Sequence, residues 1–187
     1  MYEKIESCPV CSSNTFTNEI ICNDYSVSNE QFVIVRCDQC KFLLTNPRPL
    51  PDRLAAYYES DNYVSHSSKA NNIVNFFYKI ARYFTLRSKQ KLILKYSDKD
   101  RSLLDYGCGS GSFLEFCENK GWKVTGVEPN EKARSLAINN SNSTVEENID
   151  HLDNETTYNI ITLWHVLEHI PDLNVALEKI TAKLSKK

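Results

Sequence analysis

The 187-residue sequence contains no apolar stretch long enough to span a membrane. Its first residues, Met1 to Cys8, also lack the basic cluster and apolar run that are typical of a secretory signal. No internal repeat is visible, so a repeat protein is not expected. Hydrophobic residues make up 41% of the chain and charged residues 25%, which predicts an ordinary globular protein with a core. We therefore expect a cytoplasmic protein.

Disulfide bonds are not expected either, because the seven cysteines form an odd set and no secretory signal is visible. Four of them stand in two Cys-x-x-Cys pairs: Cys8 with Cys11, and Cys37 with Cys40. Four thiolates on two short turns suit a tetrahedral Zn²⁺ ion. Because such a site leaves no coordination position open, the metal is predicted to be structural.

Two other roles are open to the cysteine-bearing residues 1–50. A thioredoxin-type dithiol would need one pair within a βαβ unit, and neither pair has that setting. A nucleic-acid-binding ribbon would need a basic surface, whereas residues 1–50 hold four basic and six acidic side chains. A structural zinc ribbon, with no nucleic acid as partner, is therefore the favoured interpretation.

The formal net charge of −2 hides a basic segment between Lys69 and Arg101. This segment holds nine basic residues against Asp98 and Asp100, so its net charge is +7. Such a block suits an acidic partner, such as a phosphorylated substrate, a lipid headgroup or RNA. A solvated helix face is the commoner meaning of a charge run and is the favoured interpretation.

Residues 51–99 are predicted to form a linker and an amphipathic helical segment. They follow the zinc ribbon of residues 1–50, in which Gln31–Arg36 is rich in β-branched and aromatic residues and predicts a strand. The helix is expected from about Asn71 to Lys95, because apolar residues recur there at intervals of three and four. We expect this apolar stripe to belong to the core; its members are Ile73, Phe76, Phe77, Ile80 and Phe84.

Residues 100–187 alternate between predicted strands and helices. Gly121 stands where a helix ending at Lys120 would need a C-terminal cap. Alternation of this kind predicts an α/β domain with a parallel, Rossmann-like sheet and crossover helices. Strands are expected at 102–105, 122–127 and 158–164, and helices at 112–120, 131–139 and 172–185.

A glycine-rich turn follows the first of these strands, in Leu103–Gly111 (Leu-Leu-Asp-Tyr-Gly-Cys-Gly-Ser-Gly). Glycine lets backbone N–H groups and the positive end of the next helix approach a ligand closely. Asp105 ends the strand before the turn, and Glu128 ends the next strand, where an acidic side chain meets ribose hydroxyls. The arrangement predicts a nucleoside ligand.

A nicotinamide-dependent enzyme is the less favoured interpretation of this loop. A dinucleotide fingerprint would have glycine or alanine in place of Ser112. The carboxylate of Asp105 would also repel a pyrophosphate, whereas it suits a ligand with a cationic amino group. These features favour a sulfonium cofactor.

Three segments together resemble class I S-adenosylmethionine-dependent methyltransferases: Leu103–Gly111, Gly126–Asn130 and Ile161–Leu173. The resemblance implies that S-adenosylmethionine is the cofactor. It implies further that Asp105 and the loop hold the methionine moiety, that Glu128 holds the ribose hydroxyls and that Asp150 lies near the adenine. The implied cofactor-binding set, in which Cys108 contributes its backbone, is Asp105, Gly107, Cys108, Gly109, Gly111, Glu128 and Asp150.

His165, Glu168 and His169 match the spacing of one metalloprotease motif. A zinc site of that type needs a sustained helix, but Pro171 follows closely and a strand is expected to run directly into the motif. In the family that the chain resembles, this segment lies at the carboxyl end of the fourth strand, beside the methyl donor. His165 is therefore the candidate catalytic base, with a positioning or packing role as the alternative. Glu168 and His169 are assigned to local structure.

The zinc ribbon, followed by Leu44–Pro49 and a tyrosine-rich stretch at 57–66, resembles a bacterial subgroup of these methyltransferases with an N-terminal zinc-binding region. The resemblance implies a small-molecule acceptor, such as a nucleotide-linked sugar or another surface-polysaccharide or natural-product intermediate. It also places Tyr63 and His66 near the active site as part of a lid, with an ordinary surface role as the alternative.

A complete class I domain continues, after a helix like the one expected at 172–185, with a glycine-containing turn and further strands. This sequence stops at Lys187. We therefore expect a C-terminally incomplete sheet with an exposed edge, to be completed by a missing segment or by a partner. The alternative function is a non-catalytic zinc-ribbon module that binds a nucleoside or another protein.

Overall fold

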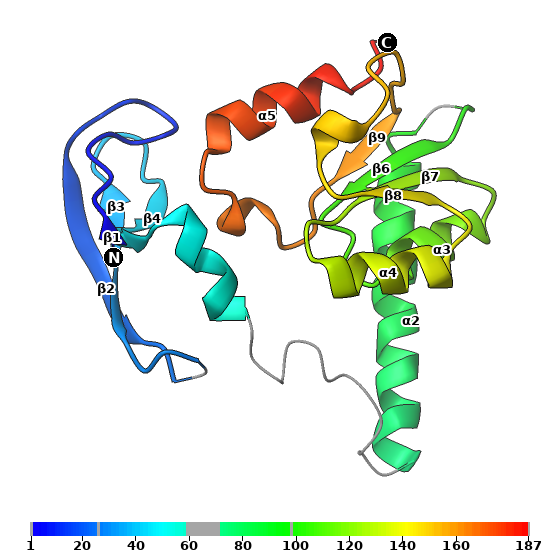
Figure 1. The fold of residues 1–187 in the computed structure, drawn as a ribbon, viewed down its shortest axis with the longest axis horizontal. Helices are drawn as coiled ribbons and strands as arrows, with labels where there is room; N and C mark the ends of the chain where they lie inside the picture. The colour runs from blue at the N-terminus through cyan, green and yellow to red at the C-terminus, as the bar shows by residue number, and fades with distance from the viewer. Residues whose placement is uncertain (1, 26, 59–71, 98, 187) are drawn as a thin grey trace. The chain divides into compact units, whose positions relative to one another are not determined.

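The computed structural model describes residues 2–25, 27–58, 72–97 and 99–186. Tyr63 and His66, the predicted lid residues, lie outside the described residues. The chain divides into two compact units, Met1–Lys69 and Ala70–Lys187 (Figure 1). Within the described residues, no helix is long and apolar enough to cross a membrane.

The first unit is built around an antiparallel sheet with the strand order β2-β3-β4. A short pairing of β1 with β5 and the 3₁₀ helix η1 complete it. These elements are β1 (Tyr2–Glu3), β2 (Phe16–Asn23), β3 (Gln31–Cys37), β4 (Leu43–Thr45), β5 (Arg48–Pro49) and η1 (Pro51–Tyr58). Strand β3 confirms the strand predicted at Gln31–Arg36 and buries Val35 and Cys37.

Strand β2 has no counterpart among the predictions. Its sequence, FTNEIICN, does not alternate cleanly between apolar and polar residues, and its side chains are exposed except for that of Phe16. It forms because its backbone pairs with β3 along its length, from Phe16 opposite Cys37 to Asn23 opposite Gln31. Hydrophobic periodicity identifies a strand that buries one face, so it does not reveal a strand whose side chains are mostly exposed.

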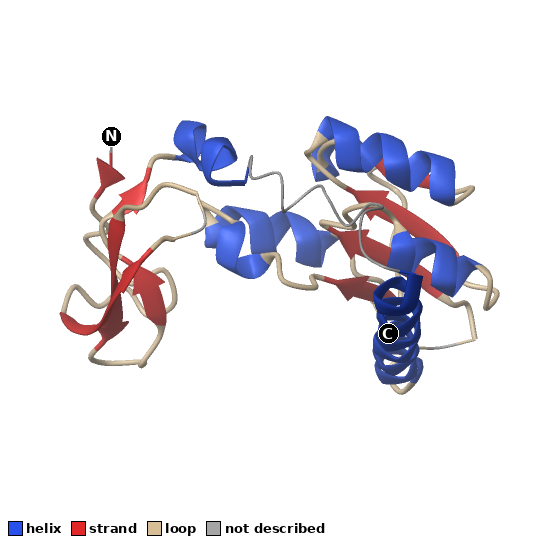
Figure 2. Cartoon of the chain, turned by 90° about the horizontal axis from the view of Figure 1, so that it is seen from below, coloured by secondary structure: helices blue, strands red, loops and turns tan. Residues whose placement is uncertain are grey.

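The second unit is an α/β structure with a four-stranded parallel sheet, as predicted. The strand order is β8-β7-β6-β9, so β7 and β6 are central. The strands are β6 (Ser102–Tyr106), β7 (Lys123–Val127), β8 (Thr144–Glu146) and β9 (Ile160–Thr162). Helices cover both faces of this sheet (Figure 2).

Three helices lie on one face of the sheet and one lies on the other (Figure 1). The first three are α2 (Asn72–Leu94), α3 (Ser112–Glu118) and α4 (Glu131–Asn140); the fourth is α5 (Leu173–Ala182). Leu103 and Leu104 are neighbours in β6 and are both fully buried. Leu103 packs with Phe113 of α3, whereas Leu104 packs with Ile180 of α5. Successive side chains of β6 therefore point to opposite faces of the sheet, so this strand contributes to the hydrophobic core on both faces.

Strand β9 is shorter than predicted. It pairs with β6 only at Ile160, Ile161 and Thr162, which lie beside Leu103, Leu104 and Asp105. Tyr158, predicted to begin the strand, instead forms an isolated parallel bridge with Leu184. Strand β8 was outside the predicted elements, because three residues are too few to show a period.

The apolar stripe of α2 does not belong to the core, contrary to the prediction. Its members Phe77, Ile80 and Phe84 are 64%, 37% and 58% exposed, and the side chains of the other two lie outside the described residues. The buried contacts of α2 come from Ile93 and Leu86, which pack against the α3 side of the sheet. These two residues are about two helical turns apart, so they share a face that the stripe does not occupy.

Candidate cofactor site

The glycine loop connects the carboxyl end of β6 to the N-terminus of α3. Gly107, Gly109 and Gly111 all have positive φ, at 75°, 57° and 76°. A Cβ at Gly111 would lie 2.7 Å from the Cα of Ala137 in α4, so this position admits only glycine. Among the residues that the structure describes, a Cβ at Gly109 would meet nothing within 4 Å, so the loop faces open space at this position.

Glu128 lies directly beyond β7 and is only 8% exposed. One carboxylate oxygen accepts a hydrogen bond from the backbone N–H of Gly109, and the other accepts one from the N–H of Asn130, both at 2.9 Å. The side chain thus joins the glycine loop to the turn before α4. An ionised carboxylate has about four acceptor sites, so Glu128 keeps lone pairs for two ligand hydroxyls.

Asp105 occupies the last buried position of β6 and is 3% exposed. The strand register places it beside Thr162, whose hydroxyl donates a 2.6 Å hydrogen bond to the carboxylate. Burial raises the pKa of Asp105 to about 7, although the hydrogen bond from Thr162 and the charge of Lys89 act in the opposite direction. A cationic ligand group beside this carboxyl group would favour its ionised form.

The side chain of Cys108 turns away from the loop and into the core. Its thiol is buried and packs above Gly126, where an added Cβ would come within 2.7 Å of the sulfur. Burial raises the pKa of this thiol, which favours its protonated form. Contact of a ligand with the backbone of Cys108 stays a prediction.

Asp150 lies in the 3₁₀ helix η2 (Ile149–His151). Its carboxylate accepts a 2.5 Å hydrogen bond from Lys179 of α5, and both side chains are about half exposed. Burial raises the pKa of Tyr106 at the end of β6, and the charge of Asp150 adds a smaller effect in the same direction.

A family model described as a methyltransferase domain matches residues 78–187, more than half of the chain. The match includes the glycine loop, Glu128 and His165. The chain belongs to the class I S-adenosylmethionine-dependent methyltransferases.

Curated relatives of this chain include ubiquinone biosynthesis O-methyltransferases. That of Vibrio parahaemolyticus serotype O3:K6 is 37% identical over 83 residues, which cover 38% of this chain and 34% of the relative. That of Colwellia psychrerythraea is 34% identical over 83 residues, which cover 39% of this chain and 33% of the relative. The chain thus spans about a third of the length of the curated relatives that it matches.

Solved methyltransferases share the fold. Magnesium protoporphyrin IX methyltransferase (ChlM) from Synechocystis PCC 6803, with bound S-adenosylmethionine, aligns with a TM-score of 0.55 and 18% identity, covering 75% of each chain. CalS10, an amino pentose methyltransferase from Micromonospora echinaspora, aligns with a TM-score of 0.50 and 18% identity, covering 64% of this chain and 55% of that chain. At this identity, both likenesses concern the fold alone.

His165 closely follows β9 and adopts a left-handed backbone conformation, with φ of 58°. Its side chain is 87% exposed, and its Nδ1 lies 3.9 Å from a carboxylate oxygen of Glu168. Residues Leu167–His169 form only the 3₁₀ turn η3, so no sustained helix presents the metalloprotease motif. Among the described residues, the four cysteines form the one group of potential metal ligands.

Cys8, Cys11, Cys37 and Cys40 of the first unit converge as the sequence predicts. The sulfurs of Cys8 and Cys40 are 3.6 Å apart, those of Cys11 and Cys37 are 3.5 Å apart, and all four lie within 4.8 Å of one another. Four thiolates at about 2.3 Å from a tetrahedral Zn²⁺ would be about 3.8 Å apart. The sulfur–sulfur distances, all within 4.8 Å, are therefore compatible with one zinc ion bound by the four cysteines.

The two cysteine turns have the same local structure. Each pair is followed by a residue with positive φ, Ser12 at 60° and Lys41 at 67°. The N–H of Ser12 donates to the carbonyl of Cys8, and the N–H of Lys41 donates to that of Cys37. This shared geometry directs both pairs of sulfurs to one point.

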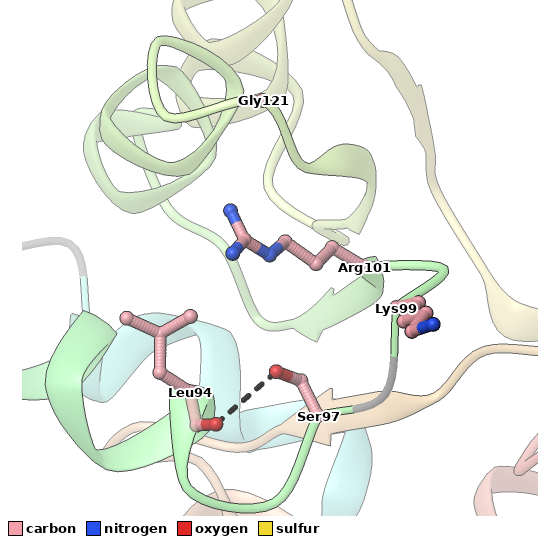
Figure 3. A pocket seen from close by; sticks show the side chains of 5 residues that line it. All are labelled: Leu94, Ser97, Lys99, Arg101 and Gly121. Atoms are coloured by element: carbon pink, nitrogen blue, oxygen red, sulfur yellow. Dashed lines mark hydrogen bonds between the residues drawn. The ribbon is translucent and has the colours of Figure 1, made fainter.

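A cavity of about 640 Å³ is lined by residues that include Arg101 and Gly121, just before the amino ends of β6 and β7 (Figure 3). None of the predicted site residues lines it. Open α/β sheets bind ligands at the carboxyl ends of their strands, so this cavity is not the cofactor site. Its lining consists of Leu94, Ser97, Lys99, Arg101 and Gly121.

Three residues near the carboxyl end of β9 were not predicted as site residues. Thr162 is brought beside Asp105 by the pairing of β9 with β6. Trp164 and Lys89 form a cation–π pair, with the ammonium 4.6 Å from the ring centroid. Lys89 belongs to the segment predicted to be a solvated face, and it is partly buried instead. Nothing in a single sequence distinguishes it from its exposed neighbour Lys91.

Proposed function

We propose that the chain binds S-adenosylmethionine at the carboxyl ends of β6 and β7 and transfers its methyl group to a small molecule. The observation that supports this best is the contact of Glu128 with the N–H of Gly109, in a chain of the methyltransferase family. Glu128 holds the ribose hydroxyls, and Asp105 with the glycine loop holds the methionine moiety. Asp150 borders the adenine.

When bound, S-adenosylmethionine supplies an activated methyl group on a sulfonium, and an in-line attack by the acceptor releases S-adenosylhomocysteine. The protein mainly has to align the acceptor and exclude water. His165 takes a proton from the acceptor when the acceptor is a hydroxyl. Its position beyond β9, its exposed ring and its left-handed backbone support this role.

The acceptor we propose is a nucleotide-linked sugar or another intermediate of surface-polysaccharide or natural-product synthesis. Support comes from the basic segment 69–101, because helix α2 contains lysines and arginines but no acidic residue. A phosphorylated acceptor would be attracted by this charge. Transfer of a labelled methyl group to such sugars tests the proposal, and activity on neutral acceptors only would contradict it.

The zinc ribbon of residues 1–50 is proposed to hold one structural Zn²⁺ on Cys8, Cys11, Cys37 and Cys40. The metal would join the two turns and take the place of a hydrophobic core that this small region lacks. A cytoplasmic location is part of the same proposal, since none of the seven cysteines forms a disulfide bond.

Calorimetry with S-adenosylmethionine on the whole chain tests cofactor binding. Glu128→Ala should weaken binding at least about tenfold, because a hydrogen bond to a charged group contributes about 1.5–3 kcal/mol. Glu131→Ala, an exposed position in the first turn of α4, is the matched control and should bind as the wild type does. Glu128→Gln keeps one acceptor oxygen and reports the result if the alanine variant does not fold.

The outcomes separate the two functional hypotheses. Binding with methyl transfer supports the enzyme. Binding of the cofactor and of zinc, without transfer to any acceptor, favours a non-catalytic interaction module. Wild-type protein that does not bind, or a Glu128→Ala variant that binds equally well, would refute the assigned site.

A further inference from the structure

Helix α2 carries a continuous stripe of exposed side chains along one face. Its members follow one another at alternating intervals of three and four residues, so they lie on the same side of the helix. All of them are exposed. The stripe begins with three apolar side chains and ends with two basic ones. We call it the outer stripe of α2; its members are Phe77, Ile80, Phe84, Arg87 and Lys91.

The outer stripe lies opposite the part of α2 that packs in the core. Ile93 is 4% exposed and packs with Leu103, whereas Phe84 is 58% exposed. Nine residues separate Phe84 from Ile93, which is about two and a half helical turns, so the two side chains leave the helix in opposite directions. The N-terminal half of α2 also extends beyond the other helices of the second unit (Figure 1). The stripe is therefore a surface feature of this unit.

The apolar part of the outer stripe is rich in aromatic rings. Phe77 and Phe84 are 64% and 58% exposed, and Tyr83 beside them is 47% exposed. The ring of Tyr83 meets those of Phe84 and Phe116, with centroids 5.9 Å and 5.8 Å apart, so α3 supports this aromatic group from below. Single exposed apolar residues are normal on a protein surface, whereas apolar side chains gathered on one face indicate contact with another apolar phase.

The charge of α2 selects among the possible occupants of this face. The helix contains five basic residues and no acidic one. Arg82 turns toward α3, where its guanidinium donates to the hydroxyl of Ser112. Arg87 and Lys91 instead continue the apolar stripe, and among the described residues neither belongs to an ion pair. An apolar face that is continued by cations is complementary to a surface that is both apolar and anionic.

We propose that the outer stripe binds an anionic phospholipid surface, with α2 lying in the plane of the membrane interface. Phe77, Ile80 and Phe84 enter the boundary between headgroups and acyl chains, while Arg87 and Lys91 contact the phosphates of the headgroups. The binding is peripheral and reversible, because one helix face buries a limited apolar area and the rest of its affinity comes from screened charge.

A second copy of the chain is the competing occupant. Two α2 helices packed through their outer stripes would bring together five basic residues from each helix, with no carboxylate on either helix to neutralise them. Like charges at such a contact repel each other. A lipid surface avoids this cost, because its phosphates supply the negative charge and its acyl chains receive the aromatic rings.

Sedimentation of the whole chain with vesicles tests the proposal. Vesicles of phosphatidylcholine are compared with vesicles that contain equal parts of phosphatidylcholine and phosphatidylglycerol. We expect the wild type to bind the anionic vesicles at least about tenfold more strongly, and added salt should reduce this preference. Phe84→Ser should weaken binding to the anionic vesicles at least about fivefold, because an aromatic side chain no longer leaves water. The double variant Arg87→Gln, Lys91→Gln should lose most of the preference for anionic vesicles.

Two exposed positions on α4 provide matched controls. Leu136 is 48% exposed, and Lys132 is an exposed basic residue of the same helix. Leu136→Ser and Lys132→Gln should both bind the anionic vesicles as the wild type does. A tryptophan introduced by Phe84→Trp should be quenched by brominated phospholipid in the vesicles, whereas one introduced by Leu136→Trp should not, with the wild-type signal of Trp122 and Trp164 as background.

Each result decides the assignment. Equal binding of both kinds of vesicle by the wild type, or unchanged binding by Phe84→Ser and by the double variant, would overturn it. If the wild type binds no vesicles and forms a dimer that Phe84→Ser dissociates in analytical ultracentrifugation, a second copy occupies the stripe and the proposal is wrong. If Phe84→Ser does not give the thermal unfolding curve of a folded protein, Phe77→Ser replaces it in the same comparison.

Discussion

Asp105→Asn should change how the stability of the second unit depends on pH. The carboxyl group is 3% exposed, and burial raises its pKa from 3.8 to about 7. Asparagine has nearly the same shape, and its amide oxygen can still accept the hydrogen bond from Thr162. The substitution therefore removes the titration and preserves the packing.

The magnitude follows from the shift of the pKa. In the unfolded chain the group ionises near pH 3.8, whereas in the folded chain it stays protonated up to about pH 7. Between these pH values the folded state binds more protons than the unfolded state. The contribution of Asp105 to the free energy of unfolding is therefore largest below the unfolded pKa and falls as the pH rises through the folded pKa. At about 1.4 kcal/mol per unit, the wild type should lose roughly 3 kcal/mol between pH 5 and pH 8 relative to Asp105→Asn.

Urea unfolding followed by tryptophan fluorescence measures this difference. Both tryptophans, Trp122 and Trp164, lie in the second unit, so their fluorescence reports on the unit that contains Asp105. Asp100→Asn removes an exposed carboxylate that pairs with Lys123 and serves as the control, with a profile expected to parallel the wild type. If the profiles of Asp105→Asn and the wild type are also parallel, the reasoning is wrong.

Two further predictions concern the glycine loop and the cysteine cluster. Gly109→Ala should lower the free energy of unfolding by about 1 kcal/mol, because alanine is strained at this positive φ. Gly111→Ala should lower it clearly more, because its Cβ would also clash with Ala137. Urea unfolding compares the two variants, and equal losses would show that α4 does not constrain the loop. Cys40→Ser should reduce the zinc content, measured by elemental analysis, below one equivalent per chain. The control Cys22→Ser changes a cysteine outside the cluster and should keep the zinc. If both variants keep the zinc, the four-cysteine site is refuted.

Much of the second unit was predictable because short apolar segments alternate with helix and turn signals along the chain. Helices α3, α4 and α5 and strands β6 and β7 each lie within a few residues of the predicted ranges. The exposed strand β2 and the short strand β8 were missed because neither carries a readable period. The stripe of α2 was misassigned because periodicity reveals an apolar face but not whether another element covers it.

The residues of the candidate site also differ in whether the sequence alone could predict them. Asp105, the glycines and Glu128 stand at fixed points of a strand, a turn and the next strand, so their spacing alone indicated a nucleoside site. The two Cys-x-x-Cys pairs could also be predicted from the sequence, because each pair lies within one local turn. Lys89, Thr162 and Trp164 were not, because they come from elements far apart in the chain.

The sequence by itself therefore determined the parallel α/β domain, the glycine loop with its acidic partner and the four sulfurs that fit a metal. The tertiary structure alone decided that Asp105 is buried beside Thr162, that Cys108 faces the core and that Lys89 meets Trp164. The physical reason is that turns and periodic faces follow from neighbouring residues, whereas burial and charge pairing depend on strand register and helix packing. The pKa of a carboxyl group belongs to the second kind of property.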